Sequence, residues 1–299
     1  MLQPVAFALL SGVVAPKALA RAKWAAYAPR LAAAAWLVLM VVFSLACALG
    51  TTQLLLPDEL GHQLGPVLAA VWDHAWWRAD ADGTRVLLGT GAGLAVLALP
   101  GAAFARELFA ARARRGRHVR ALRLVGRRAP GSAVTVLDHD TPAVYCVPGR
   151  PARVVVSSGA LRVLSPDQLE AALAHERAHL RGRHHLLVVG ADAYRRAFGR
   201  LPLARLAGER LPLLVEMAAD DRALRGCSRE ALATALYEVA AGHTPGGAFA
   251  AGGPSAVVRI QRILRPAGPR RPALSGLGWL AVAGAVAVPV AFACCGFLG

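Results

Sequence analysis

Charged residues are scarce in this sequence. Only 17% of its 299 residues are Asp, Glu, Lys or Arg, whereas a typical soluble chain has about 25%. Hydrophobic residues make up 56%, above the usual range of roughly 45–50%. This composition argues against an ordinary soluble protein, and it indicates that part of the chain lies in a lipid bilayer.

Acidic residues are scarcer than basic ones: 18 Asp and Glu stand against 34 Lys and Arg, for a net charge of +16. Such an excess is typical of nucleic-acid-binding proteins, or of membrane proteins with basic cytoplasmic flanks. The arginines are concentrated between positions 112 and 128, directly after an apolar run, and no aromatic side chains lie among them. This arrangement favours the membrane and argues against direct nucleic-acid binding.

A cysteine framework is also missing. The five cysteines are an odd number, they are scattered, and none forms a CxxC pair. The sequence therefore contains neither a disulfide framework nor a thiolate metal site. We interpret all five cysteines as small apolar residues.

Three uncharged apolar runs are long enough to cross a bilayer, which takes about 20 helical residues. They are Leu31–Leu56, Val86–Ala105 and Leu274–Leu298. A fourth run, Leu2–Pro16, is shorter and contains a proline. No Lys or Arg precedes Lys17, so this run does not resemble a cleaved signal peptide. We expect it to be a first span, with a re-entrant or interfacial helix as the alternative.

The charge distribution predicts the orientation of these spans. The loop after Leu56 is acidic and carries Trp72, Trp76 and Trp77, whereas the arginine run follows Val86–Ala105. The positive-inside rule then places both termini outside and the arginines in the cytoplasm of a multi-pass plasma-membrane protein. We expect three regions: a membrane region at 1–109 (spans at about 2–16, 31–56 and 86–105), a cytoplasmic domain at 110–271 and a C-terminal transmembrane helix at 272–299.

The predicted cytoplasmic domain begins with an arginine-rich stretch of helix, and a small sheet follows. Three β-branched runs, Ala133–Leu137, Ala143–Val147 and Arg153–Ser157, are separated by turn residues and predict a small antiparallel sheet. Ser165, Pro166 and Gln168 then form a capping-box pattern. It predicts a helix that runs to about Arg181 and stops at Gly182. The expected fold is therefore a helical membrane protein with an α+β domain inserted before the last span.

This helix carries the motif His175-Glu176-Arg177-Ala178-His179. Histidines four residues apart lie on one helical face and can reach one metal ion, while Glu176 can serve as a general base. The alternative is a surface helix with two unrelated histidines.

A third metal ligand is expected downstream, because a catalytic zinc usually has three protein ligands. Glu216 offers the missing carboxylate, on a segment opened by Pro212 and closed by Gly226. Asp220 lies one turn later and is placed to support a ligand histidine. The alternative for both residues is that they are solvated helix charges.

These motifs carry a resemblance. The segments VVVSSGALRVLSPDQLEAALAHERAHLRGRHH, VEMAADDRAL and VVRIQRIL, in this order between apolar runs, resemble the BlaR/MecR-type integral-membrane zinc peptidases. HtpX-like and CAAX prenyl proteases are more distant relatives of that group. The resemblance implies a gluzincin-like fold with one Zn²⁺ per chain on His175, His179 and Glu216. It further implies Glu176 as the base and Asp220 behind the ligands.

The same resemblance suggests how substrate binds. It assigns the strand that contains Val144, Tyr145, Cys146 and Val147 to an extended substrate. His243 is a candidate oxyanion stabiliser, and the alternative is that it is a surface histidine. The chain departs from the family in two places. We expect no C-terminal penicillin-binding sensor domain, and His184 stands where HtpX-like enzymes have an aspartate.

The expected function is a membrane-embedded zinc endopeptidase that cleaves a cytoplasmic BlaI-like transcriptional repressor or itself. One alternative is an HtpX-like quality-control protease for membrane proteins. Another is a non-proteolytic membrane signalling or scaffold protein with an inert zinc site.

Overall fold

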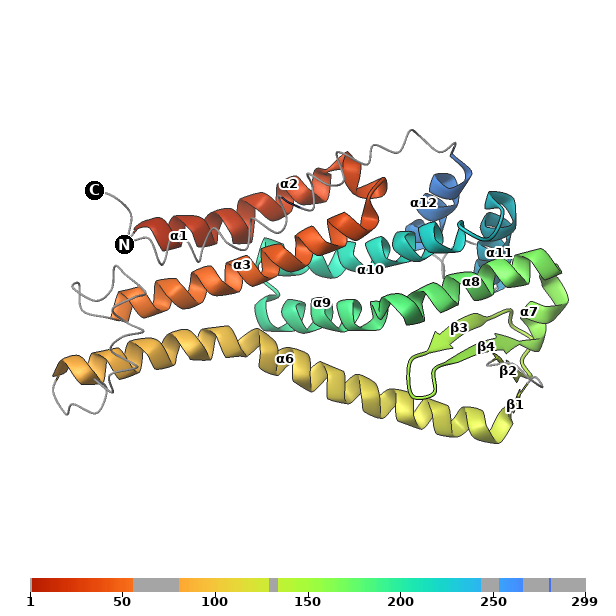
Figure 1. Cartoon of the computed structure of the whole chain (residues 1–299), viewed down its shortest axis with the longest axis horizontal. Helices are drawn as coiled ribbons and strands as arrows, with labels where there is room; N and C mark the ends of the chain where they lie inside the picture. Colours follow the sequence, from red (N-terminus) through yellow and green to blue (C-terminus); the bar gives the residue numbers. More distant parts are fainter. Residues whose placement is uncertain (1, 56–80, 129–133, 243–252, 266–279, 281–299) are drawn as a thin grey trace. The chain divides into compact units, whose positions relative to one another are not determined.

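The computed structural model describes residues 2–55, 81–128, 134–242, 253–265 and 280 (Figure 1). Their contacts divide the chain into two units. One unit contains Met1–Arg106, Ala191–Arg210 and Arg271–Gly299, and the other contains Glu107–Gly190 and Leu211–Arg270. We call them the N-terminal unit and the site unit.

The N-terminal unit is helical. Its elements are α1 (Leu2–Leu9), a π-helical turn (Leu10–Val14), α2 (Ala15–Arg21), a 3₁₀ turn (Lys23–Ala26), α3 (Pro29–Leu55), and the first part of α6 (Ala81–Val125). The adjoining parts of α9 (His184–Phe198) and α10 (Pro202–Ala223), at Ala191–Arg210, complete this unit.

The α9–α10 turn packs against α3 within the N-terminal unit. Tyr194 is 3% exposed, and its hydroxyl donates to the Met40 carbonyl at 3.3 Å. The Phe198 ring meets the Phe43 ring edge-on, with centroids 6.1 Å apart. This segment therefore belongs to the core around α3, although it lies far from α3 in the sequence.

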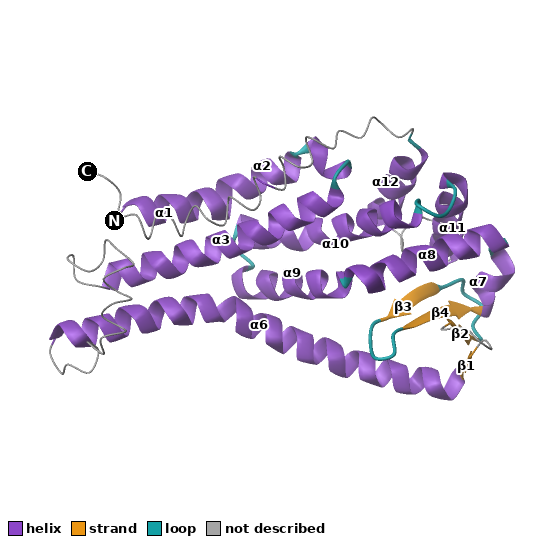
Figure 2. Ribbon diagram, viewed as in Figure 1, coloured by secondary structure: helices purple, strands orange, loops and turns teal. Residues whose placement is uncertain are grey.

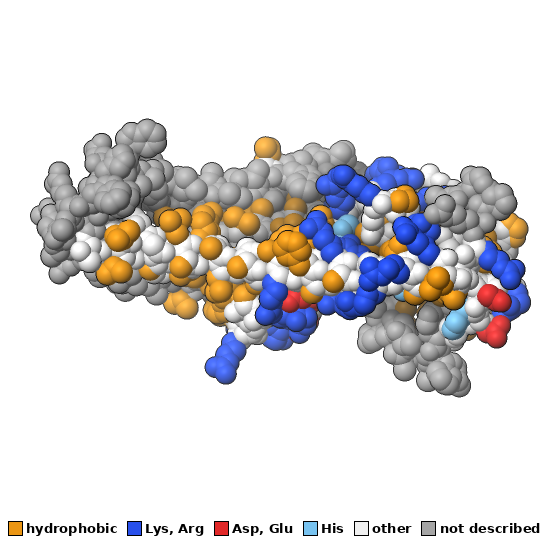
Figure 3. All heavy atoms as spheres, turned by 90° about the horizontal axis from the view of Figure 1, so that it is seen from below, with side chains coloured by type: hydrophobic (Ala, Val, Ile, Leu, Met, Phe, Trp, Pro, Cys, Tyr) orange, Lys and Arg blue, Asp and Glu red, His pale blue; other side chains and the backbone are white. Residues whose placement is uncertain are grey.

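Two helices of the described residues are long and apolar enough to span a membrane, at Pro29–Thr52 in α3 and Leu87–Val125 in α6. Apolar side chains cover the first part of α6, and basic side chains gather over its last part (Figure 3). Leu2–Pro16 forms shorter helices that are not among the two candidates. The predicted span Leu274–Leu298, except Leu280, and the tryptophan-rich loop lie outside the described residues. The predicted multi-pass topology and orientation stay predictions.

The site unit holds a four-stranded sheet and most of the remaining helices (Figure 2). Its strands are β1 (Gly126–Arg128), β2 (Val134–Leu137), β3 (Val144–Val147) and β4 (Arg153–Ser157). The helices that follow are α7 (Ser158–Val163), α8 (Pro166–Gly182), α11 (Arg229–Gly242) and α12 (Gly253–Leu264).

The sheet is mixed, so the prediction of an antiparallel sheet is wrong. The strand order is β1-β2-β4-β3, with β2 parallel to β4 and the other two pairs antiparallel. After β2, the chain does not place the next strand beside it. Strand β3 forms the far edge of the sheet, and β4 then returns to fill the position between β2 and β3. Val154, Val155 and Val156 are all buried, which is the pattern of a central strand covered on both faces.

Helix α8 begins as predicted. The Ser165 side chain accepts from the Gln168 N–H, and the Gln168 side chain accepts from the Ser165 N–H. The helix ends at Gly182, but the left-handed residue is Arg183, with φ of 49°. Pro212 lies inside α10 rather than at the start of a helix. The expectation that a proline opens that segment is therefore wrong, since the flanking turns continue the helix across it.

Candidate metal centre

Helix α8 presents two imidazoles from successive turns of one face. The Nε2 atoms of His175 and His179 lie 3.0 Å apart. His175 is 5% exposed, because its turn of the helix packs into the interior of the site unit beside Ala171 and Ala178. Four-residue spacing thus places two ring nitrogens at one point.

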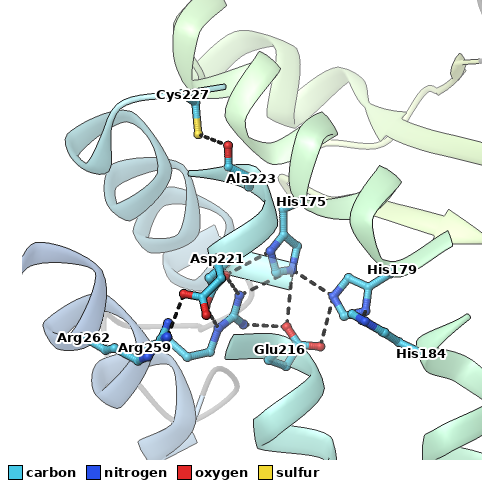
Figure 4. A network of polar contacts seen from close by, with 10 residues as sticks. His175, His179, His184, Glu216, Asp221, Ala223, Cys227, Arg259 and Arg262 are labelled. Carbon is cyan, nitrogen blue, oxygen red and sulfur yellow. Dashed lines mark hydrogen bonds and ion pairs between the residues drawn. The ribbon is translucent and has the colours of Figure 1, made fainter. Parts of the chain in front are cut away.

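Glu216 approaches the same point from α10. Its carboxylate lies 3.4 Å from the Nε2 atoms of both His175 and His179, one oxygen towards each ring. One ligand atom from each of the three residues falls within 4.8 Å of the others, and no other such group occurs in the described part of the chain. Figure 4 shows the two rings and the carboxylate facing one another.

Asp220 lies behind His175, one turn after Glu216 on α10. It is fully buried, and its Oδ1 lies 3.0 Å from His175 Nδ1. The carboxylate is out of line with the ring N–H, so this is a close polar contact rather than a linear hydrogen bond. Asp220 thus faces the ring nitrogen that points away from Glu216, the place expected of a group that orients a ligand histidine.

Arg259, on α12, completes the cluster. Its guanidinium donates to both carboxylate oxygens of Asp220, at 2.7 and 2.9 Å, and lies 2.8 Å from Glu216 Oε2. Its Nη2 is 3.4 Å from His175 Nε2. No role was predicted for this residue from the sequence. The signal that was available is the basic residue on the apolar VVRIQRIL segment, since a buried carboxylate such as that of Asp220 requires a nearby cation.

The charges of this cluster compensate one another. Burial raises the pKa of Glu216, but hydrogen bonds from His175 and His179 and the charge of Arg259 outweigh it and hold the pKa well below its usual range. Burial also raises the pKa of Asp220, but its hydrogen bond with Arg259 outweighs burial, so the pKa lies below its usual value. For His175, burial lowers the pKa, while Asp220 and Glu216 raise it to about 9 overall.

Glu176, the predicted base, lies between the cluster and the sheet. Its Oε2 accepts from the backbone N–H of Cys146 at 2.9 Å. Burial of the Cys146 thiol and the nearby Glu176 charge raise the pKa of that thiol. The Glu176 carboxylate is therefore held by a main-chain donor of β3, and it takes no part in the three-residue group.

Strand β3 forms one edge of the sheet and pairs only with β4 among the described strands. Ser157 donates to the Ala143 carbonyl at 2.9 Å. Because alternate residues of an antiparallel strand face their partner, the main-chain groups of Tyr145 and Val147 face β4. Those of Val144 and Cys146 face away from it, on the side of Glu176. His243 lies outside the described residues.

Two imidazole nitrogens and one carboxylate oxygen form a donor set of catalytic zinc sites, and the neighbouring carboxylate is the base that metal-assisted hydrolysis requires. Both Nδ1 atoms of the ligand imidazoles face polar partners, so the residues fit a bound zinc ion. Metal-dependent hydrolases use an arrangement of this kind.

Residues 111–199 match the sequence profile of peptidase family M48. This match supports a metallopeptidase function, and members of that family are zinc-dependent in general. It includes the sheet and both histidines but ends before Glu216, Asp220 and Arg259, which only the fold brings to the site. No curated protein and no solved structure matches the chain.

Proposed function

We propose that the chain is a membrane-embedded zinc endopeptidase. The observation that carries the proposal is the convergence of His175, His179 and Glu216 within 4.8 Å, from two helices distant in sequence. The carboxylate of Glu176 lies beside this group without belonging to it. Surface carboxylates and histidines with no shared function have no reason to meet in this way.

Each residue has a distinct role in this proposal. His175, His179 and Glu216 would hold a zinc ion, which would supply Lewis-acid chemistry for hydrolysis. Glu176 accepts the proton of the attacking water and returns it to the leaving amine. Asp220 orients His175, and Arg259 neutralises the two carboxylates on α10.

An extended substrate would be held along β3. The outward N–H and C=O groups of Val144 and the outward C=O of Cys146 offer hydrogen bonds to an added strand. The Cys146 N–H, on the same edge, donates to Glu176. A peptide aligned on this edge is therefore delivered next to the proposed base.

We further propose a regulatory substrate in the cytoplasm, either a BlaI-like transcriptional repressor or the chain itself. The resemblance of the motifs to BlaR/MecR-type peptidases supports this, and so does the arginine-rich end of α6, which the positive-inside rule assigns to the cytoplasm. Quality-control proteolysis would instead show as cleavage of many unrelated membrane proteins.

The Glu176→Gln variant tests the proposal. Glutamine keeps the size of the side chain but accepts no proton, so peptide hydrolysis should fall by about 10²–10⁴-fold. Zinc content should stay at the wild-type level, because Glu176 holds no metal. Glu170→Gln, on the exposed face of the same helix, is a matched control. Wild-type activity in Glu176→Gln would support a scaffold with an inert zinc site and overturn the proposal.

A further inference from the structure

His184, the first residue of α9, lies against one of the proposed zinc ligands. Its Nδ1 is 3.1 Å from His179 Nδ1, and the two rings meet edge-to-face with centroids 4.8 Å apart. Only 8% of His184 is exposed. Figure 4 shows its ring directly behind that of His179, on the side away from Glu216.

The turn between α8 and α9 produces this contact. Arg183 adopts a left-handed conformation, which interrupts the helix for one residue between α8 and α9. At this interruption the His184 ring lies against the His179 ring on the last turn of α8. A Cβ at Gly182 would lie 2.3 Å from His184 Nε2. A residue with a side chain would therefore push His184 away from its place, which explains the glycine there.

The geometry assigns the hydrogen atoms of this pair. The Nε2 of His179 faces Glu216 and His175, so a neutral His179 that binds metal through Nε2 carries its hydrogen on Nδ1. That hydrogen points at His184 Nδ1. His184 can accept it only through its own lone pair, which places the His184 hydrogen on Nε2.

We propose that His184 is a positioning residue that fixes the tautomer and ring orientation of His179, as Asp220 does for His175. The inference rests on the proposed zinc site and names a support that the sequence analysis did not assign. The two supports differ in charge, because His184 is a neutral acceptor whereas Asp220 is a carboxylate. A neutral acceptor strengthens the ligand less than a carboxylate does.

Zinc affinity tests the proposal independently of turnover. The full-length protein in detergent is stripped of metal, and its zinc dissociation constant is measured by competition with a chromophoric chelator at fixed pH. His184→Ala removes the acceptor and should weaken binding by about 10–100-fold. In asparagine, Oδ1 stands at the position of the histidine Nδ1, so His184→Asn should restore binding close to wild type. His184→Asp adds a negative charge and should bind more tightly than His184→Asn.

His185→Ala is the matched control. His185 neighbours His184, and its buried Nδ1 has no hydrogen-bond partner among the described residues, so its removal should leave zinc affinity unchanged. Equal affinities for wild type and His184→Ala would overturn the inference, as would an asparagine variant as weak as the alanine variant. If His184→Ala does not fold, equal binding by the Asn and Asp variants would overturn it. A wild-type protein that takes up no zinc would instead overturn the proposed function.

Discussion

Replacing Arg259 by methionine isolates the contribution of the cation in the cluster. Methionine keeps much of the aliphatic volume but leaves Asp220, which is fully buried, without the guanidinium that binds both of its oxygens. Removing one partner of a buried ion pair costs about 3–5 kcal/mol. At about 2–4 °C per kcal/mol for a unit of this size, the midpoint of thermal unfolding should fall by about 6–20 °C.

The assay is thermal unfolding of the metal-free protein in detergent, followed by circular dichroism. Arg262→Met is the control, since Arg262 lies on the same helix and pairs at 2.7 Å with Asp221, which is 40% exposed. An ion pair with a solvent-exposed carboxylate contributes about 0–1 kcal/mol to the free energy of unfolding. The double variant Arg259→Met/Asp220→Asn removes both charges and should recover most of the loss. Equal destabilisation by the Arg259 and Arg262 variants would refute the reasoning.

Three further predictions concern other parts of the chain. Because the pKa of His175 is raised to about 9, its proton must leave when zinc binds, so zinc affinity should rise about tenfold per pH unit between pH 7 and 9. Calorimetry in buffers of different ionisation enthalpy would measure that proton, and a buffer-independent binding heat would contradict it. Cys146→Ala should keep most peptidase activity in a peptide-cleavage assay, since the main-chain N–H that holds Glu176 remains; a loss comparable with that of Glu176→Gln would assign a role to the thiol. Tyr194→Phe should lower the free energy of unfolding by about 1 kcal/mol in chemical denaturation, because the hydroxyl loses its hydrogen bond to the Met40 carbonyl and its 3.4 Å contact with Ser44 Oγ. An unchanged free energy of unfolding would contradict this.

The sequence predicted the structural features that depend on neighbouring residues alone. The capping box of Ser165 and Gln168 depends on residues three positions apart, and the shared face of His175 and His179 depends only on helical periodicity. The strands β2, β3 and β4 were also predicted, within a residue at their ends, because each is a short β-branched run between turn residues.

Three features of the site unit were not predicted. The parallel pairing of β2 with β4 is decided by where the chain crosses, which no local pattern records. Arg259 binds Asp220, which lies 39 positions away in the sequence. The sequence of its own helix gives no reason to distinguish it from a basic residue on the surface. His184 was noted only as a departure from related enzymes, because its contact with His179 depends on the left-handed backbone of Arg183.

The central claim concerns the ligands of one metal ion, and X-ray absorption at the zinc edge of the purified full-length protein tests it most directly. The account predicts one zinc per chain with only nitrogen and oxygen neighbours, at about 2.0–2.2 Å, and loss of zinc binding in Glu216→Ala. A sulfur neighbour at about 2.3 Å, or a protein that remains free of zinc, would contradict it.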